Sequence, residues 1–138
     1  MLRRLAFAPL PVAIALALAF APAFAPGAKA QDAAAGQRVF NQCRACHVID
    51  AGVRSTVGPN LHGVFGRRAG TLEGFRYSAN MKEKGEGGLV WSEETLRPYI
   101  TNPKQVVPAG SMSFPGLRNE QQVNDLIAYL RKASGAAQ

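Results

Sequence analysis

Cysteine and histidine are scarce in this chain of 138 residues, which contains two of each. Cys43 and Cys46 lie so close together that a disulfide between them would close a tiny loop and join no distant segments. A zinc site needs four ligands, and His62 is the only histidine away from this pair. A thioredoxin-like C-x-x-C would follow a strand in a βαβ unit, and no such pattern is present. The scarcity therefore argues against a disulfide scaffold, a zinc site and a thiol oxidoreductase.

The two cysteines belong to Cys43-Arg44-Ala45-Cys46-His47, which reads C-x-x-C-H, the attachment signal for a c-type haem. Two thiols at this spacing can each add across one vinyl group of the porphyrin. The imidazole of the next residue then lies under the iron. The motif therefore predicts one haem c, attached through thioethers at Cys43 and Cys46 and bound by His47.

The one long apolar run lies at the start of the chain. The short positive region Met1-Leu2-Arg3-Arg4 precedes apolar residues 5–24, and Ala28-Lys29-Ala30 fits the small-x-small rule of signal peptidase. We predict a signal peptide over residues 1–30, cleavage before Gln31 and export to the periplasm. The alternative is an uncleaved membrane anchor, which the prolines within the apolar run and the cleavage site disfavour.

Long runs of like charge are also missing. The net charge of the whole chain is +7, but residues 31–138 carry 13 basic and 9 acidic residues, a net charge of +4. No basic run or stripe of interleaved aromatic residues indicates a nucleic-acid partner. A modest positive field suits docking onto an acidic protein surface.

Residues 31–138 form one predicted domain, in which the pattern is helical over residues 32–44, 75–84, 92–101 and 119–132. Ser92 with two acidic residues after it, and Asn119 with Gln122 three positions later, are typical helix starts. Pro98 within the third helix predicts a bend or an early end. Glycines and prolines predict loops elsewhere, including residues 104–114, and no strand is indicated. We therefore predict an all-α fold of three to five helices and long loops, with a thin core that the haem completes.

Further motifs follow the haem signal: Gly58-Pro59-Asn60-Leu61-His62-Gly63, Trp91, Asn102-Pro103-Lys104, Met112-Ser113-Phe114 and Leu126-Ile127-Ala128-Tyr129-Leu130. With this series the chain resembles class I cytochrome c, of the mitochondrial and bacterial cytochrome c2 type, over nearly all of residues 31–138. The resemblance implies the class I cytochrome c fold, wrapped around one covalent haem c.

The resemblance also implies that His47 and Met112 are the two axial ligands of the iron. Met112 lies in a loop rich in proline and glycine, where a methionine is a poor candidate for ordinary core packing. Met81 is the alternative ligand. It lies in a predicted helix, and we interpret it as a packing residue.

Other positions carry over from the family one at a time. Pro59 matches the residue whose carbonyl accepts a hydrogen bond from the proximal imidazole, although a plain turn residue is the alternative. Tyr99 matches the tyrosine that lies near the methionine sulfur. Asn80 matches a polar residue of the buried hydrogen-bond network, with a helix-surface asparagine as the alternative. Three side chains match residues around the haem propionates, with a surface arginine and core aromatics as the alternatives: Arg67, Tyr77 and Trp91.

Two stretches depart from the family pattern. Where the family has Pro-Gly-Thr-Lys-Met, this chain has Pro108-Ala109-Gly110-Ser111-Met112, so the threonine hydroxyl and the lysine are missing. We expect a looser loop and the loss of one docking charge. Gly85-Glu86-Gly87-Gly88 resembles a short insertion in a surface loop.

Gly36 matches the family position where the first helix crosses the last, against Leu126 and Tyr129.

These features predict a one-electron carrier rather than an enzyme, because both axial positions would be filled by protein. The resemblance implies a bc1-type complex or a dehydrogenase as donor, a cytochrome oxidase or a photosynthetic reaction centre as acceptor, and a monomer that docks transiently. Five basic residues are candidates for a docking ring: Arg44, Arg54, Lys82, Lys84 and Lys104. An enzyme or gas sensor with an open haem is the competing hypothesis, and ready binding of carbon monoxide by the reduced protein would favour it.

Overall fold

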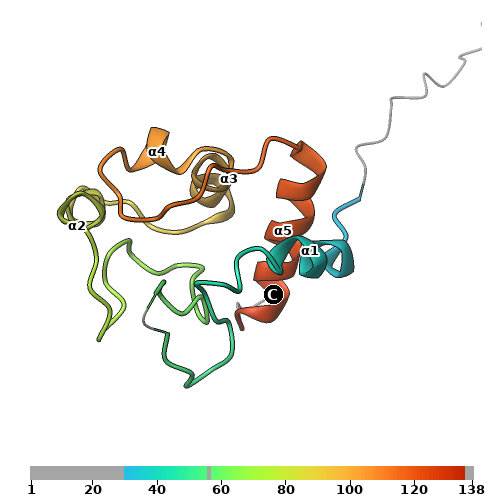
Figure 1. The fold of residues 1–138 in the computed structure, drawn as a ribbon, viewed down its shortest axis with the longest axis horizontal. Coiled ribbons are helices and arrows are strands. Elements are labelled where there is room, and N and C mark those ends of the chain that lie inside the picture. Colours follow the sequence, from blue (N-terminus) through green and yellow to red (C-terminus); the bar gives the residue numbers. More distant parts are fainter. Residues whose placement is uncertain (1–29, 56, 136–138) are drawn as a thin grey trace, which may run out of the picture.

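The described part of the molecule consists of short helices separated by long loops (Figure 1). The computed structural model describes residues 30–55 and 57–135, so the predicted signal peptide lies outside the described residues except for Ala30. The helices are α1 (Ala33–Phe40), α2 (Ala79–Glu86), α3 (Glu93–Thr101), α4 (Pro103–Val106) and α5 (Glu120–Ala133). The described residues contain no strand, and a single isolated bridge joins Arg68 to Val90. The prediction of an all-α fold is confirmed.

Polar side chains determine where α3 and α5 begin. Ser92 and Thr95 form a reciprocal capping box, in which each side chain binds the backbone N–H of the other residue. The Asn119 side chain accepts a hydrogen bond from the Gln122 N–H at 3.1 Å. These bonds satisfy N–H groups that have no partner within the first turn of a helix. Both predicted helix starts are therefore confirmed.

Some helix boundaries differ from those predicted, and one helix was not predicted. Helix α1 ends at Phe40 rather than near residue 44, because residues 41–46 form turns that lead into the C-x-x-C-H motif. Helix α2 begins after Ser78, whose side chain caps it, rather than at residue 75. Helix α4 lies in a stretch that we predicted as loop, and it begins at Pro103, a residue whose fixed φ favours the first helical position. Pro98 does not shorten α3, which continues to Thr101.

Helices α1 and α5 cross at one end of the molecule (Figure 1). A Cβ added to Gly36 of α1 would lie 1.9 Å from the Asp125 carbonyl oxygen of α5 and 2.7 Å from the Tyr129 Cβ. The rings of Phe40 and Tyr129 pack with their centroids 5.1 Å apart at the same crossing. The predicted close crossing at Gly36 is confirmed, and Tyr129 is one of the residues that it contacts.

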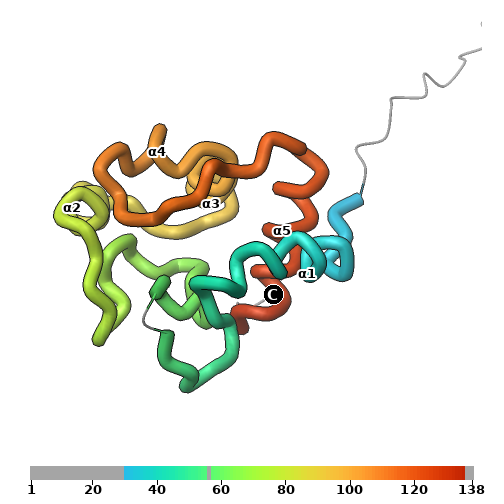
Figure 2. The backbone as a smooth tube through the Cα atoms, in the orientation of Figure 1, coloured from blue at the N-terminus to red at the C-terminus, as the bar shows by residue number. Residues whose placement is uncertain are grey.

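The loop between α1 and α2, of which residues 41–55 and 57–78 are described, runs on the side of the molecule opposite to α3 and α4 (Figure 2). Side chains from the loop, from α3 and from α5 meet in one buried cluster. The most deeply buried apolar members are Phe40, Val64, Ala69, Val107, Val123, Leu126, Ile127 and Leu130. The core therefore joins residues from both sides of the molecule, although most of residues 41–78 have no helical structure.

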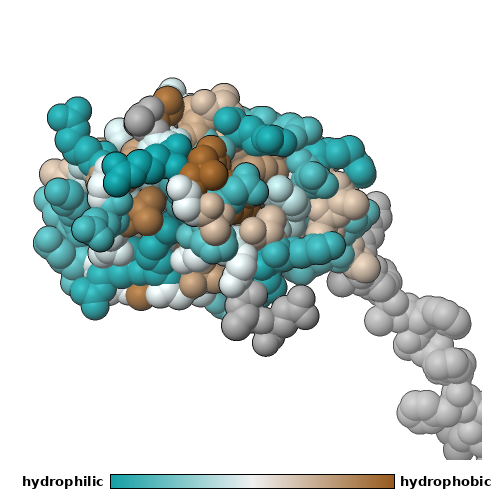
Figure 3. Space-filling model, turned by 90° about the horizontal axis from the view of Figure 1, so that it is seen from below, coloured by the Kyte–Doolittle hydropathy of each residue, from teal (hydrophilic) through white to brown (hydrophobic). Residues whose placement is uncertain are grey.

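The face of the molecule seen from below is mainly hydrophilic, with small apolar areas between the polar side chains (Figure 3). Among the described residues, the large apolar side chains that are exposed are Val53, Val57 and Val90. Over residues 30–55 and 57–135, no helix combines the length and the apolar character that crossing a membrane would require.

Candidate functional site

The C-x-x-C-H motif forms a tight turn directly after α1. The backbone N–H groups of Cys46 and His47 both donate to the Cys43 carbonyl, at 3.1 and 2.9 Å. Both cysteines are free thiols, with Cys43 half-buried and Cys46 exposed. Burial, with a smaller contribution from Cys46, raises the pKa of the Cys43 thiol to about 11. The turn thus presents two unpaired thiols and an imidazole within five consecutive residues, which is the donor set that covalent attachment of a haem requires.

The His47 ring is anchored by a residue 12 positions further along the chain. Its Nδ1 lies 2.8 Å from the Pro59 carbonyl oxygen. Because a carbonyl can only accept, Nδ1 carries the proton and Nε2 keeps a free lone pair. Burial lowers the pKa of His47, and the hydrogen bond to Pro59 opposes this effect only in part. The imidazole is therefore held in the neutral form and in the tautomer that can bind a metal through Nε2.

Gly58 leaves room for the His47 ring because it has no side chain. A Cβ at this residue would lie 2.7 Å from His47 Cε1 and 2.9 Å from the Cys46 carbonyl oxygen. The Gly58 N–H donates to the same carbonyl at 2.8 Å. We did not predict a role for Gly58. Its position directly before Pro59 was the available sequence signal.

Met112 lies in the loop between α4 and α5, and it is half-buried. The Tyr99 hydroxyl donates to the Met112 sulfur at a distance of 3.9 Å. Burial, with a smaller effect from Tyr77, raises the pKa of Tyr99 to about 12, so the hydroxyl keeps its proton at neutral pH. Met81, the alternative ligand, is only 9% exposed and belongs to the apolar core. The contact with Tyr99 thus distinguishes Met112 from Met81.

Two aromatic side chains, Trp91 and Tyr77, lie near Tyr99. Trp91 is buried, and its ring centroid lies 4.8 Å from that of Tyr99. Tyr77 packs edge-on against Phe75, and burial raises its pKa, while the neighbouring Arg67 guanidinium opposes the shift. The structure therefore brings Tyr77 near both Arg67 and Tyr99, although the three residues are well separated in the sequence.

The half-buried Arg67 guanidinium donates to two backbone carbonyls, those of Asn60 at 2.9 Å and His62 at 3.1 Å. Burial lowers its pKa, and Tyr77 opposes this effect. The ion pairs formed within the described residues join Glu93 to Arg97 and to Arg131, so no carboxylate of this part pairs with Arg67. A partly buried cation without an anion fits a cofactor that carries two propionates.

Asn80 is half-buried on α2 and connects that helix to the loop containing Met112. Its Oδ1 accepts a hydrogen bond from the Ala109 N–H at 3.1 Å, and its Nδ2 donates to Glu83 at 3.2 Å. We expected a member of a buried hydrogen-bond network. The structure gives Asn80 a backbone partner near Met112 and a side-chain partner on α2, and the network role stays a prediction.

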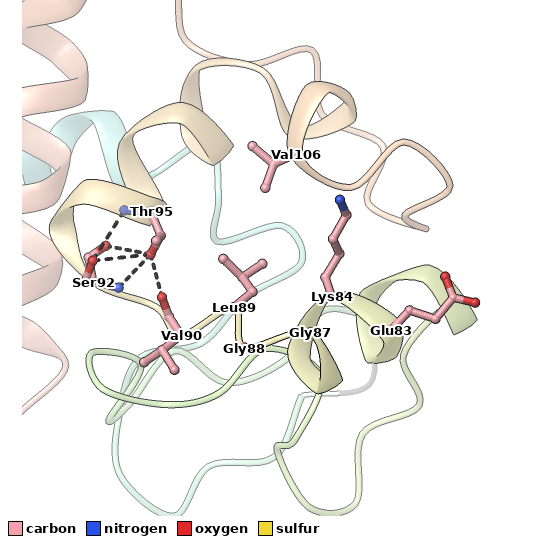
Figure 4. Close-up of a pocket in the computed structure, with 9 residues that line it drawn as sticks. All are labelled: Glu83, Lys84, Gly87, Gly88, Leu89, Val90, Ser92, Thr95 and Val106. Carbon is pink, nitrogen blue, oxygen red and sulfur yellow. Dashed lines mark hydrogen bonds between the residues drawn. The ribbon is translucent and has the colours of Figure 1, made fainter.

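The structure also has a surface hollow of about 720 Å³ (Figure 4). Its lining contains two glycines of the predicted insertion and none of the predicted haem residues; the lining residues are Glu83, Lys84, Gly87, Gly88, Leu89, Val90, Ser92, Thr95 and Val106. The capping box of α3 forms part of its wall.

A helical chain that carries a C-x-x-C-H turn, a carbonyl-anchored imidazole and a thioether beside a tyrosine hydroxyl has the features of a c-type haem protein. The comparisons with known proteins specify this class further. The sequence model of the cytochrome c family matches residues 33–134, so the chain belongs to the cytochrome c family. Its cofactor is haem c, which this family binds covalently through cysteines, and Cys43 and Cys46 are the only cysteines of the chain.

Curated relatives support the same family. Cytochrome c2 of Blastochloris viridis is 50% identical over 105 residues, which cover 76% of this chain and 80% of that protein. Cytochrome c2 of Rhodoblastus acidophilus is 48% identical over 109 residues, which cover 78% and 99%. Cytochrome c of Nigella damascena is 41% identical over 108 residues, which cover 78% and 95%. The protein is therefore a haem c electron carrier.

Proposed function

We propose that this electron carrier is a diffusible periplasmic protein whose iron is bound by His47 and Met112. The observation that carries the proposal is the pair of contacts that orient these two side chains. The Pro59 carbonyl holds His47 Nδ1 at 2.8 Å, and the Tyr99 hydroxyl lies 3.9 Å from the Met112 sulfur. A neutral imidazole and a thioether are the axial pair typical of electron-transfer haems.

Haem c supplies the Fe(III)/Fe(II) couple, and the chain supplies its attachment and surroundings. Cys43 and Cys46 would form the thioethers, and His47 and Met112 would hold the iron, so no substrate would reach the metal. We therefore expect no enzymatic activity. The buried Trp91 and the apolar core exclude water, and a low dielectric constant disfavours the additional positive charge of the ferric state. A neutral sulfur ligand also favours the ferrous state, so we expect a high potential.

Export follows from the signal peptide proposed over residues 1–30, which leaves residues 31–138 as the cytochrome domain. The donor would be a bc1-type complex or a dehydrogenase, and the acceptor a cytochrome oxidase or a photosynthetic reaction centre. Exposed Arg44, Lys82 and Lys84 support docking of a monomer onto acidic surfaces, which should weaken as salt screens the charges.

The proposal is tested by Met112→Ala. Loss of the thioether should open the sixth position, remove the ferric methionine–iron absorption band and lower the potential by more than about 0.1 V, since axial ligands help to tune haem potentials over about 0.8 V. Met81→Leu is the control, and it should keep both the band and the potential. An unchanged band in Met112→Ala, or ready carbon monoxide binding by the reduced wild-type protein, would show that the ligand assignment is wrong.

A further inference from the structure

The loop that precedes Met112 has very little backbone hydrogen bonding of its own. Within this part of the described chain, the bond from the Gly110 N–H to the Val107 carbonyl, at 3.0 Å, is the only one that residues 108–116 make to other backbone groups. Gly110 and Ser111 also replace the threonine and lysine that are usual in the family. The loop therefore needs contacts from elsewhere in the fold if it is to hold Met112 in one position.

Two neighbouring helices make such contacts. Asn80 of α2 accepts a hydrogen bond from the Ala109 N–H at 3.1 Å. The Lys104 ammonium group of α4 donates to the Gly110 carbonyl oxygen. Both bonds reach backbone groups two or three positions before Met112. The bond from Lys104 has a charged donor, and charge-assisted hydrogen bonds are stronger than neutral ones.

The ends of the segment are also held. Val107 is only 1% exposed and belongs to the core, and the Met112 sulfur lies next to the Tyr99 hydroxyl. An opening of the loop that moves Met112 away from Tyr99 would pull on residues 108–111. The bonds to Asn80 and Lys104 oppose this movement.

We infer that Lys104 is a positioning residue for Met112, rather than a residue whose main role is to provide a docking charge. The inference rests on the proposed axial role of Met112. Lys104 stabilises the closed loop from outside, at the place where the loop lacks the side chains usual in the family. Replacing Lys104 with a residue that cannot donate to Gly110 should increase the population of open loops.

The experiment uses the ferric holoprotein and imidazole as an external ligand, because imidazole can reach the sixth position only when Met112 has left it. Lys104→Gln should increase the observed rate of imidazole binding about fivefold, the effect expected from losing one modest hydrogen bond. Lys104→Arg keeps a charged donor and should restore a rate close to that of the wild type. Lys132→Gln, which removes the same charge from the exposed last turn of α5, should leave the rate unchanged.

Hydrogen exchange of the Ala109 amide in the same holoproteins gives a second measurement. It should accelerate in Lys104→Gln and not in Lys132→Gln, because the Ala109 N–H is bonded to Asn80 only in the closed loop. Equal imidazole rates and equal exchange in the two glutamine variants would overturn the inference. Loss of salt-dependent electron transfer in Lys104→Gln without either change would likewise show a docking charge only. Failure of the proposed ligation appears separately, as a wild-type protein without the methionine–iron band.

Discussion

The crossing of α1 and α5 offers a sharp test, because Gly36→Ala sets two effects of opposite sign against each other. In an exposed helix, replacing glycine by alanine stabilises by about 1 kcal/mol. Here the new Cβ would lie 1.9 Å from the Asp125 carbonyl oxygen, whereas real Cβ atoms essentially never come within 3.0 Å of such an atom. The obstacle is the backbone of α5, which cannot rotate away as a flexible side chain would. The two helices must therefore separate by about 1 Å.

The separation would loosen the packing of Phe40, which is 2% exposed, against Tyr129. Overpacking typically costs about 1–3 kcal/mol, and partial exposure of one large apolar side chain adds to that cost. If partial exposure of Phe40 costs about 1 kcal/mol, it offsets the gain in helix propensity, and we expect a net loss of about 1–3 kcal/mol from the free energy of unfolding. Relative to a typical total of about 5–15 kcal/mol, this is a large change.

The assay is equilibrium unfolding of the holoprotein in guanidinium chloride, followed by Trp91 fluorescence and by far-ultraviolet circular dichroism. Gly87→Ala is the matched control. Gly87 is exposed, has a φ of −73°, and its added Cβ would have no neighbour closer than 3.3 Å. We expect this control to change the stability by less than about 1 kcal/mol. A Gly36→Ala protein as stable as the control would refute the close-crossing argument.

Three further changes give independent tests. The pKa of Glu93 is lowered, chiefly by its hydrogen bond from Arg131, so the charged form stabilises the fold above the unfolded pKa of about 4.3, and this contribution disappears as the pH falls through the lower folded value. In Glu93→Gln, the free energy of unfolding, measured in urea, should therefore fall less steeply as the pH drops below 5. The effect should be under about 1 kcal/mol, because the Glu93 side chain is 27% exposed. The Ser134 hydroxyl is buried without a hydrogen-bond partner in the described chain. Ser134→Ala should therefore raise the thermal midpoint and increase the free energy of unfolding by up to about 1 kcal/mol. Cys43→Ala should weaken or abolish stable haem attachment, which intact mass reports directly.

Each of these tests has a clear contrary result. If the fall in stability below pH 5 is the same in Glu93→Gln as in the wild type, the ion pairs of Glu93 do not contribute to pH-dependent stability. A lower thermal midpoint in Ser134→Ala would indicate that the hydroxyl has a partner in solution. Full recovery of doubly linked haem in Cys43→Ala would contradict the thioether assignment.

Local sequence signals predicted the features that depend on neighbouring residues. Ser92 and Asn119 cap helices as expected, because a capping side chain needs only the backbone a few positions away. The boundaries of α1 and α2 were less accurate. Phe40 ends α1 where the chain turns into the haem motif, and that end depends on turns that a helical pattern does not reveal. Helix α4 was missed because the glycines and prolines that follow Pro103 indicated a loop.

Some features of the candidate site could be predicted from the sequence, and others could not. The C-x-x-C-H motif could be read directly, because the chemistry of thioether formation sets the spacing within five residues. The partner of Asn80 could not be predicted, since Ala109 lies 29 positions further along the chain. Gly110 lies only six positions from Lys104, but nothing in the sequence marks its carbonyl as the acceptor. Lys104 illustrates the difficulty, because a lysine in a sequence indicates a charge but not the acceptor that the charge will reach.

The sequence by itself determined that this chain carries a covalent haem c on an all-α domain, because attachment chemistry and helical periodicity depend on residues close together along the chain. Only the tertiary structure decided which nitrogen of His47 keeps its lone pair, since the Pro59 carbonyl that selects the tautomer lies 12 positions further along the same loop and reaches the ring through the fold of that loop. It also decided that a side chain at Gly36 would collide with α5 and that Asn80 binds the Ala109 N–H. These contacts depend on the path that the folded chain takes between distant residues, and no local pattern encodes that path.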